Sequence, residues 1–233
     1  NGTNGKVYLY QYQETGWKRL GAPLQNVSTG YQLQKYNGSL YAGYVSSGDW
    51  TYKLFRWNGS GWTSVFSSSD RCMSGVYGTA AAADGIYFSY VNESGALCVY
   101  RYTASGVTKL GNVVAQSSGM ANITLAAEQG TVMLGYRDAF ANDRLYVKMY
   151  DRSSNAWKDA GNLSLQGEGI LKSYGNQIYL LRNGRYDSGI GELYRFAPAS
   201  SEGTWSKVGN AAFSPTNVSE RDMCFPGGVP YIV

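Results

Sequence analysis

A unit of about 45 residues recurs five times along this 233-residue chain. Each copy is an alternating strand that ends in an aromatic residue, followed by a short turn rich in Gly, Ser or Asn and then by a strand that usually carries Trp. The terminal aromatic residues are separated by 45, 45, 48 and 46 positions, and they are Tyr12, Trp57, Tyr102, Tyr150 and Phe196. Self-similarity at such a period indicates a repeat architecture.

A second column of tight turns lies between these units. Dipeptides such as Asn37-Gly38 and Asp84-Gly85 are strong signals for two-residue hairpins. The column comprises Asn37-Gly38, Asp84-Gly85, Gln129-Gly130, Gly175-Asn176 and Gly227-Gly228. Each turn is preceded and followed by an apolar strand, so one period holds four strands. Four antiparallel strands in 45 to 50 residues predict one blade of a β-propeller.

The two ends of the chain predict how the ring closes. The chain starts with the third and fourth strands of a blade, at residues 6–21, and stops after a first and second strand, at residues 220–233. Pairing these halves would leave no unpaired strand edge. We therefore predict one all-β domain, residues 1–233, that is a five-bladed propeller. Its blades are expected at residues 28–66, 72–111, 119–161, 167–209, and 220–233 together with 6–21.

Composition agrees with this fold and narrows the possible chemistry. Twenty Lys and Arg against sixteen Asp and Glu give a net charge of +4, spread along the chain, which does not favour a nucleic-acid partner. No apolar run is long enough to insert in a membrane. The three cysteines are expected to be buried free thiols, and they are Cys72, Cys98 and Cys224. The chain has no His, which excludes Ser-His-Asp catalysis and His-ligated metal sites.

The outer hairpins carry a resemblance to known repeats. The sequence YDRSSNAWKDAG resembles the outer hairpin of kelch-like propellers, in which a Tyr precedes a Trp by a few residues. Residues 135–150 and 213–233 resemble tandem propeller repeats of bacterial secreted and surface proteins. That resemblance implies a binding or adhesion module at the cell surface or outside the cell, with any targeting signal lying outside this segment.

The loops between second and third strands are the expected ligand-binding region, because loops on a rigid scaffold commonly carry function. They lie at residues 46–51, 92–96, 138–144 and 183–192. Three of them carry an aromatic residue beside charged residues such as Asp49, Arg144 and Arg182. Aromatic faces stack on sugar rings, and Asp or Arg hydrogen-bonds sugar hydroxyls. The candidate binding residues are Trp50, Arg137, Asp138, Phe140, Arg185, Tyr186 and Asp187.

Other interpretations stay open at this point. The same loop residues could simply pack and form surface ion pairs. Asp138, Asn142 and Asp143 could bind calcium, although their spacing fits no EF-hand, so no cofactor is expected. A propeller glycosidase would need carboxylates near the axis, where only Glu168, Glu220 and Asp222 lie close to the expected inner positions. The favoured function is a non-catalytic, lectin-like module; a protein-binding domain, an architectural spacer or a glycoside-active enzyme are the alternatives, and oligomeric state is left open.

Overall fold

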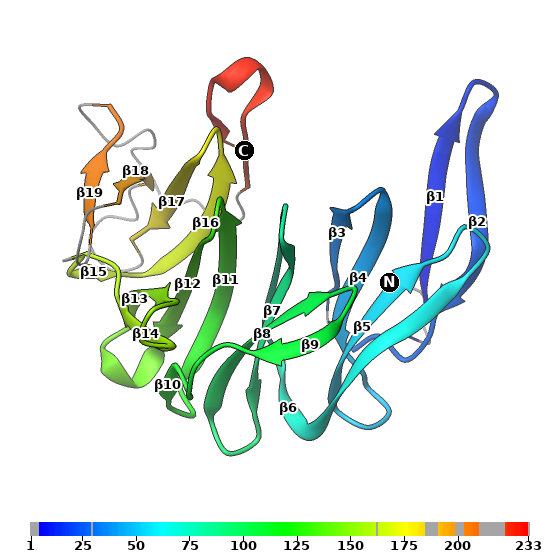
Figure 1. Cartoon of the computed structure of the whole chain (residues 1–233), viewed down its shortest axis with the longest axis horizontal. Helices are drawn as coiled ribbons and strands as arrows, with labels where there is room; N and C mark the ends of the chain where they lie inside the picture. Colours follow the sequence, from blue (N-terminus) through cyan, green and yellow to red (C-terminus); the bar gives the residue numbers. More distant parts are fainter. Residues whose placement is uncertain are drawn as a thin grey trace.

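The computed structural model describes residues 5–28, 30–161, 163–184, 191–198, 203–209 and 222–232. Within these residues the chain is all-β, with only two single-turn 3₁₀ segments, η1 (Ala139–Ala141) and η2 (Pro226–Gly228). None of the described segments forms a helix long and apolar enough to cross a membrane. The sheets stand side by side along an arc (Figure 1).

Four units of four antiparallel strands, here called blades A to D, make up the body of the molecule. Blade A comprises β3 (Gln32–Tyr36), β4 (Ser39–Val45), β5 (Thr51–Trp57) and the first half of β6 (Trp62–Ala82). Blade B comprises the second half of β6, β7 (Gly85–Asn92), β8 (Ala96–Thr103) and β9 (Gly106–Lys109), with β10 (Ala115–Gln116) beside β8. Because β6 is continuous, blades A and B share one sheet.

The next two blades are separate sheets. Blade C comprises β11 (Met120–Glu128), β12 (Thr131–Asp138), β13 (Arg144–Asp151) and β14 (Ala156–Asp159), with β15 (Leu165–Gln166) on β13. Blade D comprises β16 (Glu168–Tyr174), β17 (Gln177–Asn183), β18 (Gly191–Ala197) and β19 (Thr204–Lys207). The four-strand repeat predicted from the sequence is therefore confirmed in these blades.

The strand registers repeat as regularly as the sequence. In each blade one residue from each of the four strands pairs across the sheet to form a row. The four rows are Leu33–Ala42–Phe55–Ser64, Thr79–Phe88–Tyr100–Lys109, Leu125–Leu134–Lys148–Asp159 and Leu171–Leu180–Tyr194–Lys207. The first and second members recur every 46 residues, so each position can be compared directly between blades.

The hairpin turns explain part of this regularity. Asn37-Gly38, Gln129-Gly130 and Gly175-Asn176 all have positive φ at both residues, the geometry of a two-residue turn that matches the twist of its strands. The predicted turn at Gly227-Gly228 is wrong, because these residues lie in a longer loop, 225–230, that contains η2. A proline at each end of this loop, Pro226 and Pro230, removes two backbone donors that a closer pairing would use.

The core lies between neighbouring sheets. Aromatic residues fill the space between blades A and B, where the Phe88 ring stacks on Tyr52 at 5.1 Å and on Tyr100 at 5.4 Å. Aliphatic residues of β11 and β12 pack against blade B, and another cluster joins blade C to blade D. Each blade is thus held by the sheet on either side of it.

In blades C and D the outer hairpin links the blade to the one before it. The aromatic residue near the end of the third strand pairs directly with the Trp of the fourth strand. An example is Phe196 with Trp205, at a ring-centroid distance of 5.0 Å. The indole N–H of Trp205 donates to the carbonyl of Ala160 at 2.6 Å, and that of Trp157 to Leu110 at 2.8 Å. These two Trp residues therefore contribute to packing between neighbouring blades. We call this bond between blades the Trp clasp.

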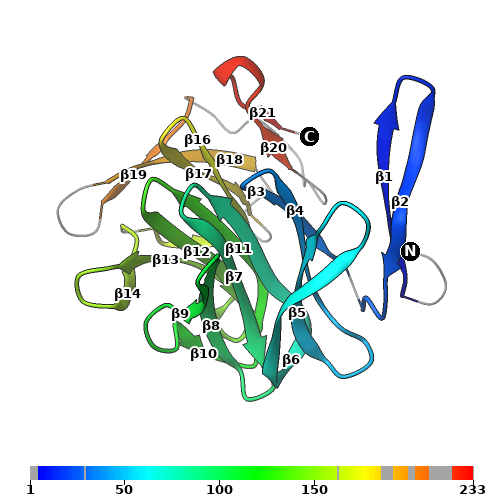
Figure 2. The ribbon, with the colours of Figure 1, turned by 45° about the vertical axis from the view of Figure 1, so that its right-hand side comes forward.

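The two ends of the chain form separate hairpins. β1 (Val7–Gln13) pairs only with β2 (Gly16–Leu24), and β20 (Met223–Cys224) only with β21 (Tyr231–Ile232). Figures 1 and 2 show β1–β2 standing apart from β20–β21, which lies beside blade D. Trp17 on β2 is 72% exposed, in contrast to its counterparts in blades C and D. Cys224 is exposed, so its predicted burial is wrong, whereas Cys72 and Cys98 are buried free thiols.

Candidate functional site

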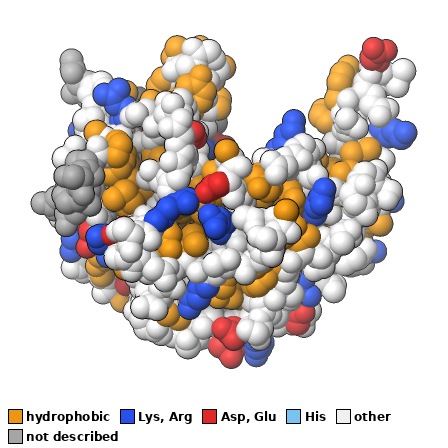
Figure 3. Space-filling view, viewed as in Figure 1, with side chains coloured by type: hydrophobic (Ala, Val, Ile, Leu, Met, Phe, Trp, Pro, Cys, Tyr) orange, Lys and Arg blue, Asp and Glu red, His pale blue; other side chains and the backbone are white. Residues whose placement is uncertain are grey.

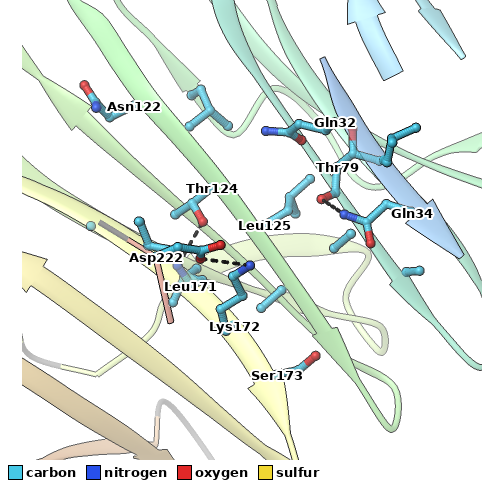
Figure 4. A pocket seen from close by; sticks show the side chains of 17 residues that line it. Gln32, Gln34, Thr79, Asn122, Thr124, Leu125, Leu171, Lys172, Ser173 and Asp222 are labelled. Atoms are coloured by element: carbon cyan, nitrogen blue, oxygen red, sulfur yellow. Dashed lines mark hydrogen bonds and ion pairs between the residues drawn. The ribbon is translucent and has the colours of Figure 1, made fainter. Parts of the chain in front are cut away.

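The inner strands surround a central cavity of about 640 Å³ (Figure 4). The first members of the four rows line it, namely Leu33, Thr79, Leu125 and Leu171. Asp222 reaches the cavity from the C-terminal segment and forms an ion pair with Lys172 at 3.1 Å. Glu168 lies 3.8 Å from the guanidinium of Arg137, and Glu220 lies outside the described residues. The two described acids considered for catalysis thus each face a cation instead of one another.

The predicted aromatic Trp50 belongs to blade A. It has positive φ, and its backbone N–H donates to Ser46 while its carbonyl accepts from Cys72. Its ring is half-buried and packs on the aromatic cluster between blades A and B. Trp50 therefore contacts the core of the molecule, in a different blade from the other described candidates.

The blade C loop contains three further candidates. Arg137 is buried and pairs with Asp143, which leaves little of it open to a ligand. Asp138 caps η1 by accepting from the backbone N–H of Phe140 at 3.0 Å, and the Phe140 side chain is 77% exposed. Among the described residues no group of three His, Cys, Asp or Glu side chains could hold a metal ion. Arg185, Tyr186 and Asp187 lie outside the described residues, so their proposed role stays a prediction.

A groove of about 500 Å³ opens next to this loop, between blades C and D. Small-molecule sites commonly measure roughly 300–1,000 Å³. The η1 loop forms one wall, β13 and the linker to blade D form the rest, and β17 contributes one charged side chain. The lining residues are Ala141, Asn142, Arg144, Tyr146, Ser164, Leu165, Gln166 and Arg182. The groove thus contains residues of the predicted blade C loop together with Arg182, which the sequence analysis considered only as a charged residue beside a loop.

Arg182 anchors a buried polar network at this groove. Its Nη1 donates to Glu192 at 2.8 Å, and its Nε donates to the carbonyl of Gln166 at 3.0 Å. Glu192 also accepts from Tyr194 at 2.7 Å and from Lys207. Burial alone would raise the pKa of Glu192, but these three donors outweigh it and lower the pKa to about 2. Both charges are therefore present at any ordinary pH.

The repeat itself identifies this pair as unusual. The residues two positions after the second member of each row are Tyr44, Tyr90, Tyr136 and Arg182. Their partners on the third strand are Lys53, Cys98, Tyr146 and Glu192. In blade A the hydroxyl of Tyr44 donates to the linker carbonyl of Gln25, as Arg182 does to Gln166. A Tyr at this position is therefore sufficient to bond the linker carbonyl. Bonding that carbonyl does not explain why blade D has Arg here.

Sequence reasoning did not identify Glu192, Tyr146 or Gln166 as site residues. The signal that could have found the network was the Tyr column at a spacing of 46 residues, which is broken only at Arg182 in the four blades described. A guanidinium and a carboxylate held side by side provide adjacent hydrogen-bond donors and acceptors in one plane. Tyr146 also lines the groove, and its ring stacks on that of Tyr136 at 5.1 Å.

Comparisons with known proteins identify the fold. No family model and no curated protein matches the sequence. A mutant of the Aleuria aurantia lectin in complex with alpha-methyl-L-fucoside has a TM-score of 0.60 at 17% identity, over 93% of this chain and 72% of that chain. The same mutant with Fucalpha1-6GlcNAc gives 0.58 at 16% identity, with coverage of 93% and 74%.

The SapL1 lectin in complex with alpha methyl fucoside is also similar, with a TM-score of 0.62 at 15% identity, over 92% of this chain and 75% of that chain. These lectins are β-propellers, and at such low identity the likeness concerns the fold alone. The chain is thus an all-β protein with the fold of propeller lectins.

Proposed function

We propose that this protein is a carbohydrate-binding module, and that the groove between blades C and D holds the sugar. The observation that carries the proposal is Arg182, which replaces the repeat's Tyr column and lines the groove. Sugar hydroxyls accept hydrogen bonds from a guanidinium, and the ion pair with Glu192 fixes the position of this one. The similarity of the fold to lectins supports the same class of ligand.

A glycan array with the isolated protein tests this proposal. We expect saturable binding that the corresponding free sugar inhibits. Calcium should not be required, because the described acids of the η1 loop already serve as a cap (Asp138) and an ion-pair partner (Asp143). An empty array together with selective capture of one protein would instead support the protein-binding alternative. Secretion, surface display and the bacterial repeat family stay predictions.

We also infer that the two terminal hairpins complete a fifth blade. In blades A to D the third member of each row pairs with the second, as Tyr194 does with Leu180. Met223 pairs with Ile232 in β20–β21, and Tyr10 pairs with Arg19 in β1–β2. These two pairs are the halves of a fifth row, which specifies that Ile232 pairs with Tyr10. The proposed fifth blade thus has one predicted register, which can be tested.

Exposed groups at both hairpins support this closure. Tyr8, Tyr10, Tyr12 and Trp17 on β1–β2 are all exposed large side chains. Gly111 and Gly161 have positive φ and lie against the next blade's outer hairpin at each Trp clasp. Gly209 occupies the same place at the end of blade D, also with positive φ, and has open space beside it. Closure would bring Trp17 to this position.

Engineered disulfides test the register. With Cys224→Ser as background, Tyr10→Cys combined with Ile232→Cys is expected to form a disulfide within one chain, because directly opposed strand residues lie within its reach. Tyr8→Cys with Ile232→Cys is the control, two residues out of register, and should cross-link far less. Cross-links between chains, or equal yields from both pairs, would contradict closure within one chain in this register.

A further inference from the structure

Arg144 is a second cation on the proposed sugar groove. Its guanidinium lies 5.0 Å from the centre of the Tyr146 ring, and both residues line the groove with Arg182. Among the described side chains, no carboxylate is within ion-pair distance of Arg144. Its cross-strand neighbour Asp138 instead caps η1. Arg144 is thus held over an aromatic face, and no contact with a described carboxylate neutralises its charge.

The other charges around the groove are balanced locally. Glu192 accepts from Arg182 and Lys207, and Asp143 pairs with Arg137, which also faces Glu168. Of the described acids near the groove, Asp143, Glu168 and Glu192 are engaged with cations, whereas Asp138 caps η1 and lies opposite Arg144 in the sheet. Figure 3 shows Lys and Arg side chains scattered over one face of the molecule, some beside Asp or Glu and others without an acidic neighbour on that face.

We infer that the groove selects sugars that carry an anionic group, either a carboxylate or a sulfate ester, and that Arg144 binds that group. This inference rests on the proposed carbohydrate function. Arg182 would donate to the hydroxyls, and Arg144 at the rim would donate to the anion in a charge-assisted hydrogen bond. The Tyr146 ring beneath it holds the planar guanidinium in place without competing for its donors.

Paired ligands measure this selectivity directly. Sialylated and glucuronylated oligosaccharides test the carboxylate, sulfated galactosides test the sulfate ester, and each is titrated beside its neutral parent. We expect the anionic member of a pair to bind roughly tenfold more tightly, since hydrogen bonds to charged groups exceed neutral ones. That preference should shrink as salt rises from about 0.05 M to about 0.5 M, because the rim is open to solvent.

Two substitutions of Arg144 test whether this residue causes the preference for anionic sugars. Arg144→Gln should reduce the preference for anionic sugars over their neutral parents to about twofold or less, and Arg144→Lys should retain most of it. Arg71→Gln removes the same charge from an exposed site on β6 and serves as control. Equal binding of charged and neutral sugars, or equal losses in Arg144→Gln and Arg71→Gln, would overturn the inference while the lectin function stands. No binding of either class at low salt would overturn both.

Discussion

Replacing Arg182 by Tyr is expected to weaken glycan binding while the protein stays folded. Loss of a charged donor that hydrogen-bonds the sugar weakens binding by about 1.5–3 kcal/mol, which corresponds to roughly tenfold or more. The fold should tolerate the change, because Tyr44 already occupies the equivalent position in blade A and bonds the equivalent linker carbonyl. Glu192 would keep Tyr194 and Lys207 as partners. Isothermal titration with a ligand identified on the array measures the effect.

The matched control is Tyr44→Phe, which removes the equivalent hydroxyl in blade A and should leave glycan affinity within about twofold. Wild-type binding should also persist down to about pH 4, because a Glu192 pKa of about 2 keeps the carboxylate ionised. The stability that ionised Glu192 contributes is fully present above pH 4.5, the ordinary pKa of a Glu side chain. It is lost as the pH falls from there toward 2. If Arg182→Tyr binds as wild type does, or if Tyr44→Phe reduces binding equally, the groove is not the sugar site.

The fold was largely predictable because the repeat is encoded by local signals. Two-residue turns such as Asn37-Gly38 and the cross-strand Phe196–Trp205 pair recur with each period, and each depends on residues close in sequence. The continuous β6 could not be predicted in the same way. The predicted gap between residues 66 and 72 lies inside this strand, which stays extended because its two halves pair with different neighbours, β5 and β7. Such pairing depends on tertiary contacts.

The candidate site was predictable only in part. Loop composition pointed to residues 138–144, and Ala141, Asn142 and Arg144 of that loop do line the groove. Phe140 and Trp50 were chosen because aromatic residues in loops suggested sugar stacking, but the aromatic residue on the groove is Tyr146, which lies within a strand. The decisive partner, Glu192, is 10 residues from Arg182 and meets it only through the register of β17 with β18. Comparing equivalent positions between blades is more informative here than loop composition.

The largest effect on stability is expected for Phe88→Ala. Phe88 has no exposed surface and stacks between Tyr52 and Tyr100, with Phe66 at 4.9 Å. Removing a buried aromatic side chain loses its transfer free energy and leaves a cavity, together about 3–5 kcal/mol. Chemical denaturation should show a lower midpoint with an unchanged slope. Phe88→Leu, which retains most of the volume, should destabilise the protein much less.

Phe140→Ala provides the surface control, because that ring is mostly exposed and its loss should change the free energy of unfolding by no more than about 0.5 kcal/mol.

Phe88 also tests how the blades are coupled. It lies on β7, which pairs with the half of β6 that belongs to blade B, while the other half belongs to blade A. The two blades should therefore unfold together, and tryptophan fluorescence and circular dichroism should give one midpoint for Phe88→Ala. Two separated transitions would show that β6 does not couple blade A to blade B.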